Sequence, residues 1–399
     1  MDKVKTILVF GAGRIGRSFI GQLFSLAGYE VIFVDVDSVL IDRLNERKAF
    51  PVVIRDSQHP GEERTIEVKN ITALHLHEEK KIIGRIEEAE VLATSVGKGG
   101  LSGLSGILNR GIASRYSRFP GKPIDIILAE NVRNAGDYLR SALLKGGASY
   151  PVDSYVGLVE TSIGKMVPIM TREQMAEDPL AVYAEPYNNL ILDGRAFKNP
   201  VPDVEGLSPK DHMKAWVDRK LFIHNMGHAA LAYRANFSFP ELVYTWEALE
   251  IPSLHEKTRE TMLQSAAILE SMYPAEFHNR QLEEHSDDLL KRFANRALGD
   301  TLFRVGCDLR RKLGRDDRLI VPILAGISLD LPVDLILEAW IRGCSFKAVG
   351  ENGRELESDR KFKLEYGLDY RRILQEHCQL SPADHPALYH SLTQMTSIL

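Results

Sequence analysis

The stretch VFGAGRIGRSF (residues 9–19) decides the fold of the N-terminal half of the chain. Gly11, Gly13 and Gly16 have the spacing GxGxxG, directly after the apolar run KTILVF and directly before a segment with helical spacing. Glycines at these places allow a tight turn, close approach of the backbone to a pyrophosphate and close packing of the helix on the sheet. The N-terminus of the helix then stabilises the anion. The alternative is an ordinary glycine-rich turn.

Asp35 separates these two interpretations, because it ends the next predicted strand, VIFVDVD. An acidic residue roughly 20 residues after the glycines can accept hydrogen bonds from a ribose hydroxyl. We therefore predict a dinucleotide site that includes Gly11, Gly13, Arg14, Ile15, Gly16 and Asp35. The carboxylate would repel a 2′-phosphate, so NAD is favoured over NADP. Arg14 and Arg17 soften this preference, and FAD shares the fingerprint.

A second glycine-containing segment, ATSVGKGG (residues 93–100), follows a later predicted strand. In a doubly wound sheet, a loop at this place passes near the nicotinamide half of the cofactor. Thr94, Ser95, Val96 and Gly97 are therefore further candidates for cofactor binding. An ordinary strand-to-helix turn is the alternative interpretation of this segment.

Strand and helix patterns alternate through the first half of the chain, as a parallel sheet covered by helices requires. Short apolar runs recur at EVLATSVG, IDIILAEN and YVGLVETSIG. After GRAFKNPVPDVEGLSPKDHMK the strand signals mostly vanish and long helical patterns follow. We predict an α/β Rossmann-type doubly wound domain over residues 1–200 and a mostly α-helical substrate and catalytic domain over residues 201–399.

Composition narrows the class of partner. The 399 residues carry a formal net charge of -5, which gives no basic surface for nucleic acid. Cys307, Cys344 and Cys378 are odd in number and lack CxxC spacing, as expected for a protein of a reducing cytosol. No apolar run approaches the roughly 18 residues of a membrane span. We expect a cytoplasmic, soluble protein that binds a small molecule.

The stretch DRKLFIHNMGHAALAY (residues 218–233) places a lysine, an asparagine and two histidines in an apolar helical run. At about 100° per residue, Lys220, His224 and His228 follow one stripe, with Asn225 about 60° from His228. The HxxxH spacing resembles that of zinc proteases, but Asn225 stands where their glutamate would be, so we expect no metal. His224 by itself is best explained as a structural histidine.

Lysine at such a place is a candidate general base. Its reference pKa near 10.4 must fall by two or three units to act at neutral pH, which costs about 3 to 4 kcal/mol. Burial in a cleft between domains and a nearby nicotinamide cation both favour the neutral amine. Asn225 can donate to a developing alkoxide, and His228 can hold a substrate hydroxyl. Asn131, in ILAENVRNAG, ends a strand at the edge where such folds bind ligands.

The chain resembles the polyol-specific long-chain dehydrogenases, the mannitol dehydrogenase family, over most of its length. FGAGRIGRSFIG, AENV, DPLAVYAEPYNNLILDG, VDRKLFIHNMGHA and RRKLGRDDRLIVPIL look like its phosphate-specific branch, the mannitol-1-phosphate 5-dehydrogenases. The resemblance implies NAD, no metal, Lys220 as the general base, Asn225 and Asn131 as oxyanion donors and His228 as a substrate ligand. It also implies interconversion of mannitol 1-phosphate and fructose 6-phosphate.

Two departures from the family pattern bear on the substrate. Ile163, Gly164 and Lys165 stand where the family usually has a Val-Asp-Arg-like stretch, and Glu160 is the nearest acid in sequence that would compensate. Cys307 replaces what is typically an arginine in the phosphate-specific branch. The remaining alternatives are a hexuronate or free-polyol dehydrogenase of the same family and a non-catalytic NAD(H)-binding protein.

Basic residues in the last quarter of the chain are candidates for binding the substrate phosphate, because a guanidinium offers bidentate hydrogen bonds to phosphate oxygens. They are Arg311, Lys312, Arg315 and Arg318. The same run, RRKLGRDDR, mixes charges of both signs, as a solvated helix end would.

Overall fold

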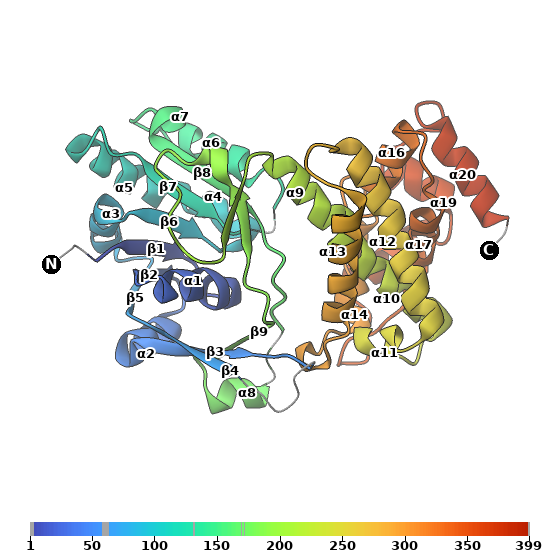
Figure 1. Cartoon of the computed structure of the whole chain (residues 1–399), viewed down its shortest axis with the longest axis horizontal. Coiled ribbons are helices and arrows are strands. Elements are labelled where there is room, and N and C mark those ends of the chain that lie inside the picture. The colour runs from blue at the N-terminus through green and yellow to red at the C-terminus, as the bar shows by residue number, and fades with distance from the viewer. Residues whose placement is uncertain (1–3, 58–63, 131, 169, 171, 398–399) are drawn as a thin grey trace. The chain divides into compact units, whose positions relative to one another are not determined.

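The computed structural model describes residues 4–57, 64–130, 132–168, 170 and 172–397. The chain forms two units, Met1–Val217 and Asp218–Leu399 (Figure 1). The division falls later than the boundary near residue 200 that the sequence suggested. The reason is strand β11 (Leu207–Lys210), which pairs with β10 (Leu190–Asp193) and so belongs to the sheet of the first unit.

The first unit is built on an eight-stranded sheet with the order β11-β10-β8-β7-β6-β1-β2-β5. The pairings from β5 to β8 are all parallel, whereas β10 runs antiparallel to β8. The remaining bounds are β1 (Thr6–Phe10), β2 (Glu30–Asp35), β5 (Ile71–His75), β6 (Val91–Thr94), β7 (Ile124–Leu128) and β8 (Val156–Ser162). The prediction of a Rossmann-type sheet is confirmed.

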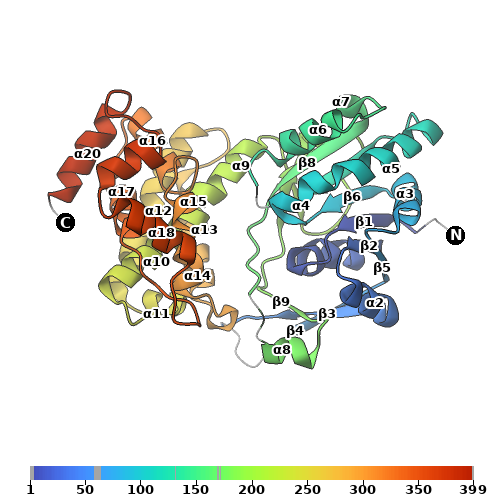
Figure 2. The same cartoon turned by 180° about the vertical axis from the view of Figure 1, so that it is seen from behind.

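Both faces of this sheet are covered, as the apolar character of β1 requires. Ile7 and Val9 join one apolar cluster and Leu8 and Phe10 the other, because successive side chains of a strand point to opposite faces. Helices α3, α5 and α6 cover the second of these faces (Figure 2). The helices of this unit are η1 (Gly16–Gly21), α1 (Gln22–Leu26), α2 (Ser38–Arg47), α3 (Glu79–Glu88), α4 (Gly97–Gly103), α5 (Ser105–Arg118), α6 (Ala135–Lys145), α7 (Val152–Tyr155), α8 (Arg172–Glu177) and η2 (Gly194–Ala196).

The same unit contains a second, three-stranded sheet. Its order is β4-β3-β9, with bounds β3 (Ala49–Ile54), β4 (Arg64–Lys69) and β9 (Val182–Ala184). Phe50 and Val52 of β3 are fully buried in the cluster that contains Phe33 of β2. This sheet was absent from the sequence prediction, because the pairing of β3 with β9 joins segments that lie far apart in the chain.

The second unit is helical, as predicted. Helix α10 (Met226–Ser238) is buried from Met226 to Ala235 and packs against α12, α14 and α17. Gly227 permits the close approach of α12, since a Cβ atom there would lie 2.6 Å from Cγ of Met262. Helix α9 (Met213–Arg219) leads into this unit. The others are η3 (Lys220–Asn225), α11 (Thr245–Leu249), α12 (Pro252–Met272), α13 (Asn279–Phe293), η4 (Arg296–Leu298), α14 (Leu302–Gly306), α15 (Leu309–Lys312), α16 (Ile320–Ser328), α17 (Asp334–Cys344), α18 (Glu357–Tyr366), α19 (Tyr370–Arg372), η5 (Ile373–His377) and α20 (Pro386–Thr396).

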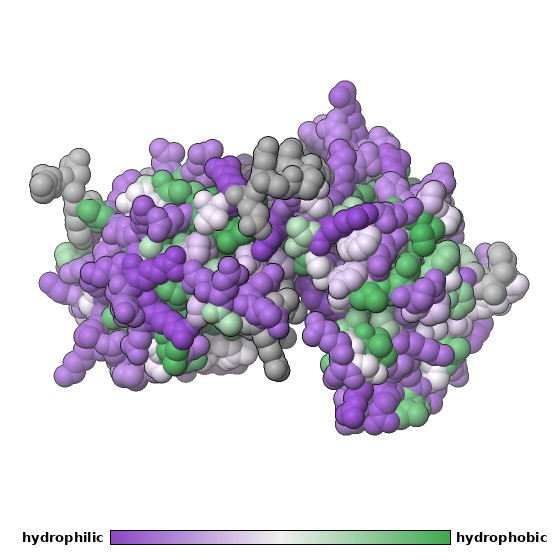
Figure 3. Space-filling view, turned by 90° about the horizontal axis from the view of Figure 1, so that it is seen from below, coloured by the Kyte–Doolittle hydropathy of each residue, from purple (hydrophilic) through white to green (hydrophobic). Residues whose placement is uncertain are grey.

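Hydrophilic residues cover most of the face shown in Figure 3, with small groups of apolar residues between them. Within the described part of the chain, no helix is both long enough and apolar enough to cross a membrane.

Candidate active site

The glycine-rich turn between β1 and η1 has the shape that a pyrophosphate needs. Gly11 has a φ of +100°, and a Cβ atom on it would lie 2.6 Å from the carbonyl oxygen of Ser95. A Cβ atom on Gly16 would overlap the carbonyl oxygen of Gly11. Around Gly13, in contrast, no described atom lies within 4 Å of the Cβ position. The first and third glycines are therefore required by packing, whereas the second leaves its backbone open to a ligand.

Asp35 lies at the carboxyl end of β2 and is joined to this turn. Its Oδ2 accepts a hydrogen bond from the backbone N–H of Ala12 at 2.6 Å, and its Oδ1 accepts from Val36 N–H at 2.7 Å and Asp37 N–H at 3.1 Å. Two carboxylate oxygens offer roughly four acceptor positions, so this carboxylate can still accept from a ribose hydroxyl.

The two arginines of the turn are held by backbone carbonyls. Nε of Arg17 donates to Ala12 O at 2.8 Å and its Nη1 to Leu180 O at 2.5 Å, and burial lowers the pKa of this guanidinium to about 10. Nη1 of Arg14 donates to Pro168 O at 3.0 Å. Ile15 packs against the apolar cluster. Arg17 is thus built into the interior and does not offer its charge to a 2′-phosphate, so the expected softening of the NAD preference by this residue is wrong.

Glu130 organises the second candidate loop and was missed by the sequence analysis. This carboxylate, 4% exposed, accepts hydrogen bonds from Val96 N–H at 2.9 Å and Gly97 N–H at 2.7 Å. Ser95 Oγ donates to Gly11 O at 3.0 Å, so the loop also contacts the glycine-rich turn. Thr94 Oγ1 is buried, and no described group hydrogen-bonds to it. Glu130 could have been recognised in the sequence from its position directly before Asn131, shortly after the strand β7.

Asn131, Glu160, Gly164 and Lys165 lie in or after the strands β7 and β8. Asn131 lies outside the described residues. A Cβ atom on Gly164 would lie 3.5 Å from Cε1 of Tyr187. Oε1 of Glu160 accepts from Gly136 N–H at 2.8 Å, and burial raises the pKa of this carboxyl. Glu160 therefore supports the start of α6. Lys165 is buried, with Nζ donating to Ser18 O, Gln22 Oε1 and Asn188 Oδ1.

In the second unit, the segment Lys220–Asn225 is a π-helical turn, η3, inserted between α9 and α10. The predicted stripe assumed an uninterrupted α-helix, and this assumption is wrong here. Residues five apart are separated by about 140° in an α-helix, but the i→i+5 hydrogen bonds of a π-helix place them about one turn apart. The turn therefore brings Asn225 onto the side of Lys220. Ser265 Oγ of α12 donates to Phe222 O at 2.7 Å and supports the widened turn.

Two histidines of this helix contact one aromatic ring. The imidazole of His228 stacks on Phe293, with centroids 4.1 Å apart and an interplanar angle of 3°. His224 meets the same ring at 5.4 Å and 64°. Burial lowers the pKa of both imidazoles well below the ordinary value, and the charges of Arg304 and Arg318 act in the same direction on His228. Both histidines are therefore neutral at physiological pH.

Nε2 of His228 is buried, and no described group hydrogen-bonds to it. Oδ2 of Asp300 lies 3.8 Å from this nitrogen, which is beyond hydrogen-bond distance. The side chain of Asp300 is 4% exposed and pairs with Arg304. Since buried polar atoms are usually paired, this nitrogen is a candidate contact for a ligand.

Lys220 is partly buried, and burial followed by the charge of Arg318 lowers its pKa to about 8. An amine with this pKa is neutral in a useful fraction of molecules near neutral pH. Arg318 has a side chain 11% exposed, and its Nε donates to Asp317 Oδ1 at 2.7 Å.

The four residues predicted to bind phosphate each contact different partners within the protein. Arg311 pairs with Asp308 at 2.6 Å and Asp317 at 3.0 Å. Arg315 donates from Nη1 to Gln379 O at 3.2 Å. Nζ of Lys312 donates to Val305 O at 2.7 Å. Of the four, Lys312 and Arg318 contribute positive charge at His228, together with Arg304 and Arg292, which the sequence analysis did not single out.

Arg292 and Arg304 were not recognised because they stand in ordinary helical segments, α13 and α14, without a motif around them. The signal in retrospect is that Arg292 immediately precedes Phe293, the ring on which His228 stacks. Cys307, at the end of α14, is half-buried, and its Sγ lies 3.7 Å from Arg304 O. Burial raises the pKa of this thiol.

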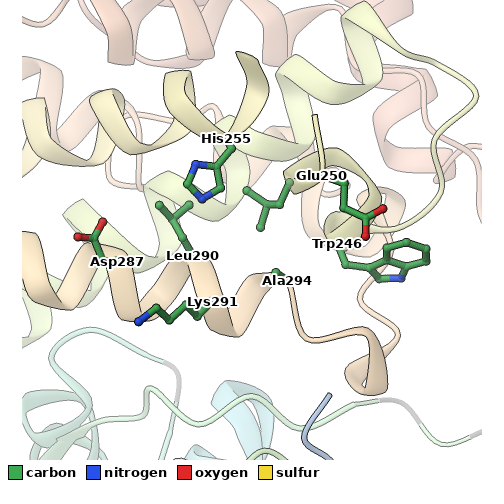
Figure 4. A pocket seen from close by; sticks show the side chains of 8 residues that line it. Trp246, Glu250, His255, Asp287, Leu290, Lys291 and Ala294 are labelled. Atoms are coloured by element: carbon green, nitrogen blue, oxygen red, sulfur yellow. The ribbon is translucent and has the colours of Figure 1, made fainter. Parts of the chain in front are cut away.

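A pocket of about 420 Å³ lies elsewhere in the second unit. Figure 4 shows side chains of α11, α12 and α13 around it, including Trp246, His255 and Lys291. The guanidinium of Arg296 lies 4.3 Å from the ring centre of Trp246 and pairs with Glu250. None of the predicted site residues lines this pocket. Among the described residues, no three His, Cys, Asp or Glu side chains are grouped so as to hold a metal ion.

Comparison with known proteins assigns both units to one family. Residues 5–206 match the model of the mannitol dehydrogenase Rossmann domain, and residues 212–376 match that of the mannitol dehydrogenase C-terminal domain. The fold is similar to that of Pseudomonas fluorescens mannitol 2-dehydrogenase in a ternary complex with NAD and D-mannitol, at TM-score 0.75 and 16% identity over 99% of this chain and 92% of the other. It is also similar to substrate-free D-sorbitol dehydrogenase, at TM-score 0.78 and 15% identity over 100% and 93%. The chain therefore belongs to the mannitol dehydrogenase family, a family of NAD-binding polyol oxidoreductases.

Proposed function

We propose that the chain is an NAD-dependent, metal-independent dehydrogenase that interconverts a sugar alcohol phosphate and a ketose phosphate, of the mannitol 1-phosphate and fructose 6-phosphate type. The observation that carries this proposal is the grouping on η3 and α10 of Lys220, Asn225 and His228, surrounded by cationic side chains. In this proposal the first unit binds the cofactor and the second supplies the proton acceptor and the substrate contacts.

The residues of the first unit fit NAD. The open backbone at Gly13 suits a pyrophosphate, and Asp35 suits a ribose with a free 2′-hydroxyl. When bound, the cofactor accepts a hydride from the carbinol carbon of the substrate. Glu130 fixes the loop Val96–Gly97, which holds the backbone along the path that we propose for the nicotinamide half.

In the direction of oxidation, Nζ of Lys220 accepts the proton of the reacting hydroxyl. Its lowered pKa makes the neutral amine available, so the proton transfer does not start from an ammonium ion. The amide of Asn225, and by the resemblance that of Asn131, donates to the oxygen as negative charge develops. The neutral imidazole of His228 uses Nε2 to hydrogen-bond a neighbouring substrate hydroxyl.

A phosphate group on the substrate is supported by the charges around His228. Arg304, Arg318, Lys312 and Arg292 all lower the pKa of this imidazole. A guanidinium has five N–H donors, so Arg304 and Arg318 can keep their carboxylate partners and still bind phosphate oxygens. We propose Arg318, Arg304 and Arg292 as the phosphate ligands, with Lys312 as a supporting charge.

The test is NADH oxidation with fructose 6-phosphate, fructose, tagaturonate and fructuronate, each measured with the wild-type protein and with Lys220→Ala. Turnover of fructose 6-phosphate that the variant loses, with unchanged NADH affinity, is the expected result. Turnover confined to a uronate, or to fructose, would replace the phosphate substrate by the corresponding member of the family. Tight NADH binding without reduction of any of the four would point to a non-catalytic NADH-binding protein.

A free polyol is the second candidate substrate. It is favoured by the fold similarity to mannitol 2-dehydrogenase, whose structure contains D-mannitol without a phosphate. The same panel separates the two, because the cationic side chains near His228 would contribute little to the binding of an uncharged sugar.

A further inference from the structure

The carboxyl ends of β1, β2 and β5 form a row at one edge of the large sheet. Phe10 of β1 is in register with Val34 of β2, and Asp35 of β2 is in register with His75 of β5. Neighbouring strands are about 4.8 Å apart. Strand β5 lies beside β2 at the edge of the sheet (Figures 1 and 2). A dinucleotide with its pyrophosphate at β1 and its ribose at β2 would therefore extend its adenine toward the end of β5.

His75, the last residue of β5, links the turns that follow β2 and β5. Its Nε2 lies 3.0 Å from Val36 O, and its Nδ1 accepts from the backbone N–H of His77 at 3.2 Å. Because a carbonyl only accepts, Nε2 carries the proton and the ring is in the Nε2–H tautomer. One imidazole thus holds two loops in a fixed relation, beside the carboxylate of Asp35.

The ring of His77 lies against that of His75, with centroids 4.0 Å apart and an interplanar angle of 36°. His77, two residues after the edge strand β5, is exposed, and Val36, directly after the buried strand β2, is 68% exposed. The contact with the ring of His75 limits the motion of this exposed imidazole, which reduces the side-chain entropy lost when a ligand stacks on its flat face.

We propose that His77, positioned by His75, is the stacking surface for the adenine ring of the cofactor, with Val36 contributing an apolar contact. Bases stack on aromatic side chains in a sequence-tolerant way because every base has a π-face. This inference rests on the proposed orientation of the cofactor, with its ribose at Asp35. It assigns a role to two residues outside the glycine-rich fingerprint.

The test compares His77→Ala, His77→Phe and a control, His390→Ala, whose imidazole is exposed on α20 of the second unit. Dissociation constants are measured by calorimetry for NADH, for AMP and for reduced nicotinamide mononucleotide, which lacks the adenosine. His77→Ala is expected to raise Kd for NADH and AMP about tenfold, which equals about 1.4 kcal/mol. Binding of the mononucleotide should not change, His77→Phe should restore most of the affinity, and His390→Ala should match the wild type.

The positioning role of His75 has its own readout. Glutamine can donate and accept as the imidazole does, whereas leucine can do neither. His75→Gln is therefore expected to retain more AMP affinity than His75→Leu, at equal affinity for the mononucleotide.

Equal weakening of AMP and mononucleotide binding in His77→Ala would show general loop damage and overturn the inference, as would wild-type affinity for AMP in that variant. Neither result would affect the assignment of NADH as the cofactor. Failure of the wild-type protein to bind NADH would overturn the proposed function as well.

Discussion

Nε2 of His228 lies 3.8 Å from Oδ2 of Asp300, too far for a hydrogen bond, while Asp300 pairs with Arg304. The carboxylate therefore holds the guanidinium in place and does not hydrogen-bond the imidazole nitrogen, which we propose as a substrate contact. Asp300→Asn is expected to lower the free energy of unfolding by about 1–3 kcal/mol, a value reduced by the 39% exposure of the Arg304 side chain. It should also raise KM for the proposed phosphate substrate. Urea unfolding and steady-state kinetics check this, and an unchanged KM would exclude a role of Arg304 in binding.

The pKa of Lys220 predicts the pH dependence of the reaction. In the proposed mechanism oxidation needs the neutral amine, so kcat/KM for the sugar alcohol should rise with pH through about 8 and level off above it. The ketose reduction needs the protonated lysine and should fall over the same range. Rate profiles in both directions test this, and a flat oxidation profile between pH values about 2 units on either side of that pKa would contradict a lysine base.

Arg318 tunes that lysine through like-charge repulsion. Removing the charge with Arg318→Met should move the midpoint of the oxidation profile to higher pH, because the ammonium form of Lys220 is then less disfavoured. Arg315→Met is the matched control, since Arg315 donates to Gln379 O, whereas Arg318 is the charge that lowers the pKa of Lys220. Equal shifts in both variants would argue against a specific effect.

The same pair of variants tests phosphate recognition. Arg318→Met should raise KM for fructose 6-phosphate at least tenfold, about 1.4 kcal/mol, and change KM for unphosphorylated fructose much less. Arg315→Met should leave both values near those of the wild type. An equal rise in KM for the two sugars would mean that Arg318 acts only on the pKa of Lys220 and does not bind phosphate.

Asp35 should determine the choice of cofactor. Asp35→Ser removes an acceptor for the 2′-hydroxyl and the repulsion of a 2′-phosphate, so the ratio of NADPH to NADH affinity should rise. Asp37→Ser removes the same charge two residues later and keeps a residue able to cap α2, where Asp37 accepts from Leu40 N–H. Titration of both cofactors with each variant checks the prediction, which fails if the two serine variants behave alike.

Alanine substitutions at two glycines of the turn should affect folding stability and NADH binding separately. Gly16→Ala places a methyl group against Gly11 O and is expected to cost about 1–3 kcal/mol in the free energy of unfolding. Gly13→Ala has room for the methyl group and should keep the stability while weakening NADH binding. Denaturant midpoints and NADH titrations measure the two effects. Unchanged NADH binding in Gly13→Ala would mean that the cofactor does not approach the backbone at Gly13.

Local sequence patterns were sufficient for the elements whose signal lies within a few residues. The glycine spacing, Asp35 and the apolar runs at β1, β2, β6, β7 and β8 predicted the Rossmann-type sheet. The run around Lys220 predicted the helix that carries Lys220, Asn225 and His228. These features depend on side-chain size and period along one segment, and such periods can be read from the sequence itself.

The tertiary structure decided what depends on distant partners. Because β11 pairs with the sheet of the first unit, that unit extends to Val217. Strand β3 pairs with β9, a segment that lies far from it in the chain. The π-helical turn at Lys220–Asn225 has no local signature, because its widened turn is supported by Ser265 of another helix. The charges at His228 likewise come from separate segments, α13, α14, α15 and the residues before α16. A sequence pattern determines which face of a segment is apolar, but the energies of burial and charge at a site depend on which other segments pack against it.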